Sequence, residues 1–330
     1  MAETAAIATT GPRSPGFGLR DFYRSEGVFR ALALAASLFV VAIFVGILVS
    51  LGAGAWPSLT RFGSRFFVST AWNPVTEHFG ALPAIYGTLV TSALAMLVAV
   101  PVGIGIAIFL TELCPRALRR PVGIATELLA GIPSIIYGIW GQFVFVPIFQ
   151  QSIQPKIVDI FSGVPVLSDL FAGPPYGIGI FTASLILSIM ILPFISAVTR
   201  DVFETVPPML KEAAYGLGCT TWEVTWNVVL PHARSGIVGG AMLALGRALG
   251  ETMAVTFVIG NAHKISASLF APGTTISAAI ANEFTEAVGD VYPSSLLETG
   301  LILFFITSVV LAAAQLLIRR LEAQSGGRTQ

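Results

Sequence analysis

Apolar residues occupy this chain in long runs separated by short charged segments. Runs without Asp, Glu, Lys or Arg lie between Glu77 and Glu112, between Glu127 and Lys156, and between Asp169 and Arg200. A helix needs about twenty apolar residues to cross the hydrocarbon of a bilayer. The pattern therefore predicts six membrane-spanning helices, over residues 31–53, 84–110, 122–149, 176–199, 235–260 and 295–318.

The composition places the chain in the same class. Of the 330 residues, 55% are hydrophobic and 11% are charged, whereas soluble domains carry about 25% charged residues. We expect an all-α polytopic membrane protein with a transmembrane permease domain over 31–320 and tails at 1–30 and 321–330. A cleaved signal peptide ending near Ala53-Gly54-Ala55 is the alternative. It is disfavoured because the apolar run over 31–51 exceeds the 7–15 residues of a signal core.

The basic residues predict how the chain is oriented, since Lys and Arg gather on the cytoplasmic side of a membrane. Segments 1–30, 111–121, 200–234 and 319–330 hold 13 of the 18 Lys and Arg, and the segments on the other side of the spans hold four. The remaining one is Arg247, within a span. Both termini and segment 200–234 are therefore expected in the cytoplasm, and the aromatic loop around Trp72 outside, as a membrane-interface belt or a docking surface.

Segment 200–234 carries a spaced motif. Glu212-Ala213-Ala214 is followed after three residues by Gly218, after nine more by Val228, and then by Leu230-Pro231. Thr220 and Glu223 suit a capping box, so the segment predicts a helix, a glycine turn and a second helix. The spacing resembles the EAA loop of ABC-importer permeases, with Val228 where the family usually has Ile. The resemblance implies that Glu212, Ala213, Ala214, Gly218, Leu230 and Pro231 form a coupling segment that docks into an ATP-hydrolysing subunit.

Two further segments are similar to the phosphate-specific transport (Pst) permeases, above all to the PstC family. They are Ala130-Gly-Ile-Pro-Ser-Ile-Ile-Tyr-Gly138 and Leu243-Ala-Leu-Gly-Arg-Ala-Leu-Gly-Glu-Thr-Met-Ala-Val255. The resemblance implies the type I (MetI-like) importer fold and uptake of inorganic phosphate across a prokaryotic plasma membrane. It also implies the partners: a PstA-like second permease, two PstB-like ATP-binding subunits and a PstS-like extracytoplasmic binding protein. ATP and magnesium would be bound by the PstB-like subunits, and this chain would need no cofactor.

Arg247 and Glu251 require an explanation, because these charged residues lie near the middle of the apolar run over 235–260. A central arginine costs about 2.5–3.5 kcal/mol on insertion scales. The two residues either form a structural ion pair one helical turn apart or provide a low-affinity binding position for an oxyanion. The oxygens of an oxyanion match the forked donors of a guanidinium group. Thr252 and Ser134 are expected beside it, and the break at Pro133 is either a simple kink or part of the pathway.

Other chemistries find no support in the sequence. The chain has no GxxxxGK[ST] phosphate loop, and its two cysteines and three histidines lack metal-ligand spacing. We therefore predict no catalytic residue and no metal site, and the formal net charge of zero gives no reason to expect nucleic acid. A permease for sulfate or molybdate stays open as the alternative, and an ion-coupled secondary transporter is the more distant one.

Overall fold

The computed structural model describes residues 19–326, with side chains described for residues 27–320. This part of the chain is helical throughout, apart from loops and one isolated β-bridge between Asn73 and His78. It divides into two units, residues 1–50 and 51–330, and helix α1 (Leu19–Phe62) crosses the boundary between them. The expected all-α class is confirmed.

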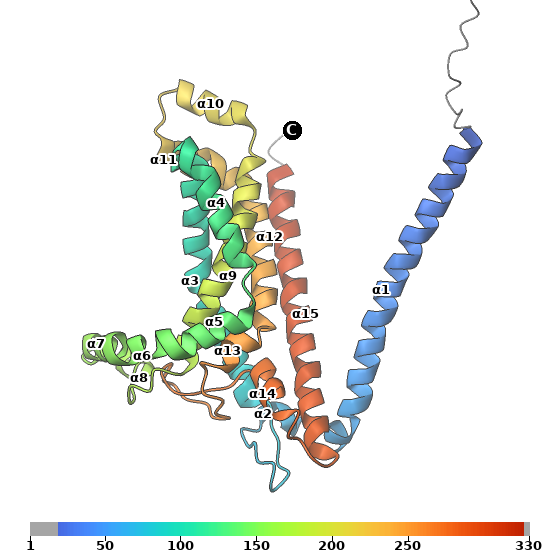
Figure 1. Cartoon of the computed structure of the whole chain (residues 1–330), viewed down its shortest axis with the longest axis vertical. Helices are drawn as coiled ribbons and strands as arrows, with labels where there is room; N and C mark the ends of the chain where they lie inside the picture. The colour runs from blue at the N-terminus through green and yellow to red at the C-terminus, as the bar shows by residue number, and fades with distance from the viewer. Residues whose placement is uncertain (1–18, 327–330) are drawn as a thin grey trace, which may run out of the picture. The chain divides into compact units, whose positions relative to one another are not determined.

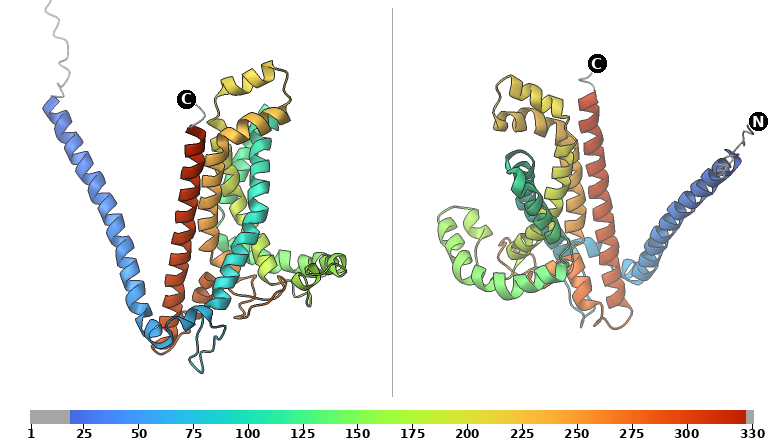
Figure 2. Two further views of the ribbon diagram at one scale, coloured as in Figure 1. Left: turned by 180° about the vertical axis from the view of Figure 1, so that it is seen from behind. Right: turned by 45° about the horizontal axis from the view of Figure 1, so that its top comes forward.

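Long helices form the framework of the unit over 51–330. They are α3 (Leu82–Ile108), α9 (Ile180–Glu204), α12 (Leu230–Leu249) and α15 (Val291–Gly326). α9 packs against α3 and α12, and α15 packs against α12 (Figures 1 and 2). Small residues permit the close approach of α12 and α9: a Cβ on Gly236 would lie 2.6 Å from Val202, and one on Gly240 would lie 2.7 Å from Val198.

Five of the described helical segments are long and apolar enough to cross a membrane. They are Gly27–Phe62, Leu82–Leu113, Ile180–Glu204, Thr221–Leu249 and Val291–Arg320. A sixth span is obtained if the segments Arg116–Ala130 and Ser134–Phe161 are counted together, although an 89° bend separates them. The helix predicted over 122–149 is interrupted at residues 131–133, because Pro133 cannot donate the backbone hydrogen bond that would continue it.

Some expected boundaries also differ from those of the structure. Residues 19–30, expected in the N-terminal tail, already belong to α1, and residues 321–326, expected in the C-terminal tail, still belong to α15. Residues 1–18 and 327–330 lie outside the described part of the chain. The single helix expected over 235–260 is instead α12, ending at Leu249, followed by the short α13 (Met253–Thr256).

The unit over 51–330 has two distinct ends. Helices α10 (Pro208–Gly216) and α11 (Thr221–Val224) lie at the same end as the C-terminal part of α15 (Figures 1 and 2). Helices α2 (Arg65–Val68) and α14 (Ile276–Glu283) lie at the opposite end. The coupling motif and the long aromatic loop after α2 are thus separated by the full length of the helices.

Candidate functional site

Gly218 fixes the turn between α10 and α11 by adopting a positive φ of 88°. Its amide donates to the carbonyl of Tyr215 at 2.9 Å, and the amide of Cys219 donates to the carbonyl of Ala214 at 3.2 Å. These are the two bonds of a Schellman motif, which closes a helix with a left-handed residue. A Cβ on Gly218 would meet no heavy atom within 4 Å, so the backbone dihedral requires glycine here, and crowding does not.

The predicted capping box opens α11. The hydroxyl of Thr220 accepts from the amide of Glu223 at 3.3 Å, and the carboxylate of Glu223 accepts from the amide of Thr220 at 2.8 Å. The helix then continues through a π-helical turn, η4 (Thr225–Val229), into α12, whose first residues are Leu230 and Pro231. Leu230 packs against a buried cluster that includes Phe203 and Val224, whereas Pro231 is exposed.

The first residues of the motif lie on α10. Glu212 and Ala213 are exposed, whereas Ala214 packs against the same buried cluster as Leu230. Lys211 anchors the helix, because its Nζ lies 2.6 Å from Oε1 of Glu112 in the π-helical turn η1 (Phe109–Leu113).

Large apolar side chains are exposed around this motif. Met209 is 78% exposed, Leu217 is 86% exposed, and Trp222 is 66% exposed and stacks on Trp226. An apolar surface on a protruding helix at one end of a membrane protein is suited to docking against another protein.

The segment with Arg247 and Glu251 is a break between two helices. Arg247 lies in the last turn of α12 with its side chain exposed, and residues 250–252 separate α12 from α13. Oε1 of Glu251 accepts from the amide of Ala254 at 3.2 Å, and the hydroxyl of Thr252 donates to the carbonyl of Gly250 at 3.3 Å. Within the described residues no ion pair joins Arg247 to Glu251. The guanidinium is thus available to a group outside this chain.

A second break lies at residues 131–133, between α4 (Arg116–Ala130) and α5 (Ser134–Trp140). The hydroxyl of Tyr137 donates to the carbonyl of Leu129 at 2.8 Å. That carbonyl is the one that Pro133 leaves without a helical partner. Ser134, half-buried, is the first residue of α5.

The two breaks are neighbours. α5 packs on α13, where a Cβ on Gly138 would lie 2.7 Å from the carbonyl oxygen of Met253. The helix that begins with Ser134 therefore lies against the helix that follows Glu251 and Thr252. Among the described residues the Ser134 side chain forms no hydrogen bond to Arg247, Glu251 or Thr252. What the fold brings together is a pair of interrupted helices, and non-helical backbone at membrane depth is tolerated where it is buried or lines a cavity.

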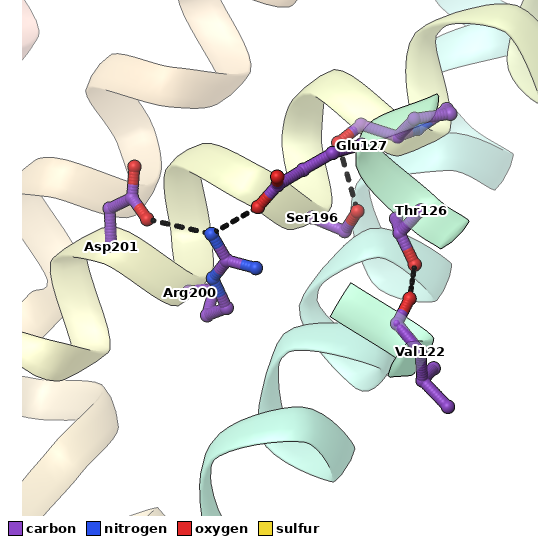
Figure 3. A network of polar contacts seen from close by, with 7 residues as sticks. Val122, Thr126, Glu127, Ser196, Arg200 and Asp201 are labelled. Carbon is purple, nitrogen blue, oxygen red and sulfur yellow. Dashed lines mark hydrogen bonds and ion pairs between the residues drawn. The ribbon is translucent and has the colours of Figure 1, made fainter. Parts of the chain in front are cut away.

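Arg200 and Glu127 form an ion pair that sequence reasoning missed (Figure 3). Nη2 of Arg200 on α9 lies 2.8 Å from Oε1 of Glu127 on α4, and 3.4 Å from Oδ1 of Asp201. A Cβ on Gly123 would lie 3.1 Å from Nη1 of Arg200, so glycine gives the guanidinium room to reach α4. The sequence did contain a signal for this pair. Glu127 lies inside the span expected over 122–149, and a carboxylate within a span requires a partner.

A second missed cluster lies at the end that carries α14. Oε2 of Glu283 accepts from the indole of Trp72 at 2.7 Å and from the hydroxyl of Tyr292 at 2.6 Å, and Nε2 of His263 lies 2.6 Å from Oε1. Trp72 also stacks on His263, with ring centroids 4.6 Å apart. Trp72 is thus a packing residue of this cluster, which the sequence interpretation as a belt or docking aromatic did not anticipate.

The carboxyl of Glu283 is held in its charged form. Burial raises its pKa and is the largest single effect, but the hydrogen bonds from His263, Tyr292 and Trp72, with the charge of His263, together outweigh it. The pKa of Glu283 is therefore below its ordinary value. Within the described residues, no three His, Cys, Asp or Glu side chains are arranged to hold a metal ion.

Comparison with known proteins decides the family. The sequence model of the family described as "Binding-protein-dependent transport system inner membrane component" matches residues 99–323. A protein from Mesorhizobium japonicum named "Phosphate transport system permease protein PstC" is 64% identical over 308 residues, which cover 93% of this chain and 94% of that protein. The protein of the same name from Pasteurella multocida is 58% identical over 301 residues, which cover 91% and 94%. The chain belongs to the PstC family.

Solved structures agree with this assignment at the level of the fold. A chain of a bacterial ABC transporter involved in the import of the acidic polysaccharide alginate has a TM-score of 0.59 and 18% identity, covering 91% of this chain and 98% of that one. At this identity the likeness shows the fold alone. The ABC-importer permease fold expected from the EAA motif is confirmed, and this PstC-family chain is a multi-span membrane permease.

Proposed function

We propose that this PstC-family chain is the permease subunit of an ATP-driven importer that carries inorganic phosphate into the cytoplasm. The observation that carries the proposal is its 64% identity, over nearly the whole length of both chains, to a permease named for phosphate transport. The exposed Arg247 at a helix break supports it, because a guanidinium offers two parallel donors to the oxygens of a phosphate.

The partners follow from the same proposal. A homologous PstA-like permease completes the membrane part, two copies of a PstB-like subunit bind ATP and magnesium, and a PstS-like extracytoplasmic protein delivers phosphate. The chain itself catalyses nothing. Its coupling surface is the exposed face of α10 with Glu212 and Ala213, the turn at Gly218, and the Leu230-Pro231 start of α12.

Phosphate passes beside the two helix breaks in this proposal. Arg247 meets the anion, while Glu251 accepts a hydrogen bond from the protonated oxygen of hydrogen phosphate. Thr252 and Ser134 supply hydroxyl groups from the adjacent segments. When the ATP-binding subunits close, α10 moves with them. The helical path over residues 221–249, which begins after the turn at Gly218 and carries Arg247 in its last turn, transmits the movement to Arg247.

The orientation of the chain is part of the proposal. We infer that both termini face the cytoplasm of a prokaryotic cell and that the chain lies in the plasma membrane in contact with its lipids. The excess of arginine and lysine in the segments around α4, α10 and the end of α15 supports this orientation. The cluster around Glu283 then faces the extracytoplasmic side.

Uptake of labelled oxyanions by the reconstituted four-component complex tests the function. We expect ATP-dependent accumulation of phosphate that a tenfold excess of sulfate or molybdate does not reduce. Sulfate or molybdate accumulated in preference to phosphate would make this chain a permease for that anion. Phosphate uptake driven by an ion gradient without ATP would instead identify a secondary transporter.

A further inference from the structure

A basic cavity lies between α4 and α9. These two helices reach the end of the unit over 51–330 that carries α10 and α11 (Figure 1). The cavity has a volume of about 240 Å³. Its charged lining residues are Arg116, Arg119, Arg120, Glu127, Arg200 and Glu204. Four arginines against two glutamates leave an excess of positive charge in a concave site.

Two of these arginines are occupied within the chain. Nη2 of Arg200 lies 2.8 Å from Oε1 of Glu127 (Figure 3). A Cβ on Gly123 would lie 3.1 Å from Nη1 of Arg200, so this side chain forms a fixed wall of the cavity. Nη2 of Arg119 donates to the carbonyl of Thr111 at 2.7 Å, which ties the start of α4 to η1.

The other two arginines are available to a ligand. Arg116 and Arg120 lie one helical turn apart on α4, and both are exposed. Neither forms an ion pair with any described residue. Two guanidinium groups on one helix face present forked donors suited to the oxygens of a phosphate group.

Apolar side chains continue from the cavity along α4. Ile124 lines the cavity and is 47% exposed, and Leu128, one turn further, is 69% exposed. A ligand with a charged head and an apolar tail matches this arrangement, because the head meets the arginines while the tail covers the apolar face.

We propose that this cavity is a binding site for a phosphate group held by Arg116 and Arg120, and that the headgroup of an anionic phospholipid supplies it. The choice of a lipid rests on the orientation proposed above, which turns this end to the cytoplasmic leaflet, where anionic lipids attract basic segments. Free phosphate has the same chemistry and is the other source to be tested.

Binding to the purified, delipidated complex in detergent tests the proposal without requiring transport. Dioctanoyl phosphatidylglycerol, dioctanoyl phosphatidylcholine and inorganic phosphate would be titrated separately, with native mass spectrometry reporting the bound fraction. The test variant is Arg116→Gln with Arg120→Gln. The matched control is Arg319→Gln with Arg320→Gln, because these exposed arginines belong to the C-terminal part of α15, at the same end, but do not line the cavity.

Each near-surface arginine contributes about 1 kcal/mol toward an anionic lipid, so the test variant should bind phosphatidylglycerol about 30-fold more weakly. The control should change by less than about threefold, and wild type should prefer phosphatidylglycerol to phosphatidylcholine. Arg116→Lys with Arg120→Lys keeps both charges and should stay within about fivefold of wild type.

Four results would overturn the proposal in whole or in part. Equal weakening in the test and control variants, or equal binding of the two lipids by wild type, would rule out a specific site at these arginines. A lysine variant as weak as the glutamine variant would contradict an attraction based on charge. Binding of inorganic phosphate that depends on Arg116 and Arg120, without such binding of phosphatidylglycerol, would keep the phosphate site and reject the lipid.

Discussion

The hydroxyl of Tyr137 reaches back across the bend at Pro133 and donates to the carbonyl oxygen of Leu129 at 2.8 Å. The bond joins the first turn of α5 to the last turn of α4, so it stabilises the 89° bend between the two segments. α5 packs on α13, the helix that follows the break after Arg247. The same bond therefore helps to hold in place the helix on which α13 packs.

Removing this hydroxyl should loosen the bend. Tyr137→Phe removes one of the two donors to the carbonyl of Leu129, the other being the amide of Ile132 at 3.3 Å. A hydrogen bond of this kind contributes about 0.5–1.5 kcal/mol. We expect a lower melting temperature of the purified complex and phosphate uptake reduced several-fold. Tyr176→Phe, at a tyrosine that is 54% exposed, is the control and should leave both measurements unchanged. Equal behaviour of the two variants would show that the bend does not depend on Tyr137.

Gly218→Val should uncouple the ATP-binding partner. A β-branched residue in the left-handed region strains the backbone by about 1–3 kcal/mol, so the turn after α10 should shift. Gly216→Val is the matched control, because Gly216 also has open space around its Cβ position but has no positive φ. Co-purification of the ATP-binding subunits and ATP hydrolysis would be measured. Wild-type co-purification and wild-type ATP hydrolysis in Gly218→Val would contradict the proposed coupling role of this turn.

The helix, glycine turn and second helix over 208–224 could be predicted from sequence because their determinants are local. A positive φ at Gly218 and a capping box at Thr220 depend on residues within one or two helical turns. The break after Leu249 was harder to predict, because apolar residues continue on both sides of it and the sequence analysis placed Arg247 and Glu251 inside one span. Pro133 did predict a break in the helix. The sharpness of the bend, however, depends on the hydrogen bond from Tyr137 and on packing against α13, and both are tertiary contacts.

Surface labelling tests the orientation. In a background lacking Cys114 and Cys219, Leu217→Cys and Val288→Cys introduce thiols at positions that are 86% and 81% exposed. A membrane-impermeant maleimide should label Leu217→Cys only from the cytoplasm and Val288→Cys only from outside. The reverse pattern would invert the proposed topology.

Acid should weaken the cluster around Glu283. Because folding lowers the pKa of this carboxyl, its stabilising contribution is present above its ordinary pKa, about 4.3, and is lost as the pH falls through the folded value. The melting temperature of wild type should therefore fall as the pH is lowered below about 4.3.

Glu283→Gln should be less stable at neutral pH by about 1–3 kcal/mol, since hydrogen bonds to a charged group are the stronger ones. The melting temperature of Glu283→Gln should also fall less at acid pH than that of wild type. Glu286→Gln, at an exposed neighbour, is the control and should keep the wild-type profile. Identical pH profiles for all three proteins would exclude a stabilising role for the charge of Glu283.

Contacts between distant segments explain what the sequence did not reveal. The partners of Glu283 are 20 residues away at His263 and 211 residues away at Trp72. Arg200 and Glu127 are separated by 73 residues, so the local sequence around either residue does not reveal its partner. Only the packing of α4 on α9 joins them.

Phosphate uptake by the variant Arg247→Leu with Glu251→Leu tests the central claim most directly. If the two residues served only to neutralise each other, an apolar pair would replace them at little cost. Because they form no ion pair in this chain and Arg247 is exposed at the helix break, we predict that the double variant assembles at wild-type abundance and transports no phosphate. Arg247→Lys, which keeps the charge and loses the fork, should retain partial uptake. Wild-type uptake by the double-leucine variant would contradict the claim that Arg247 meets the transported anion.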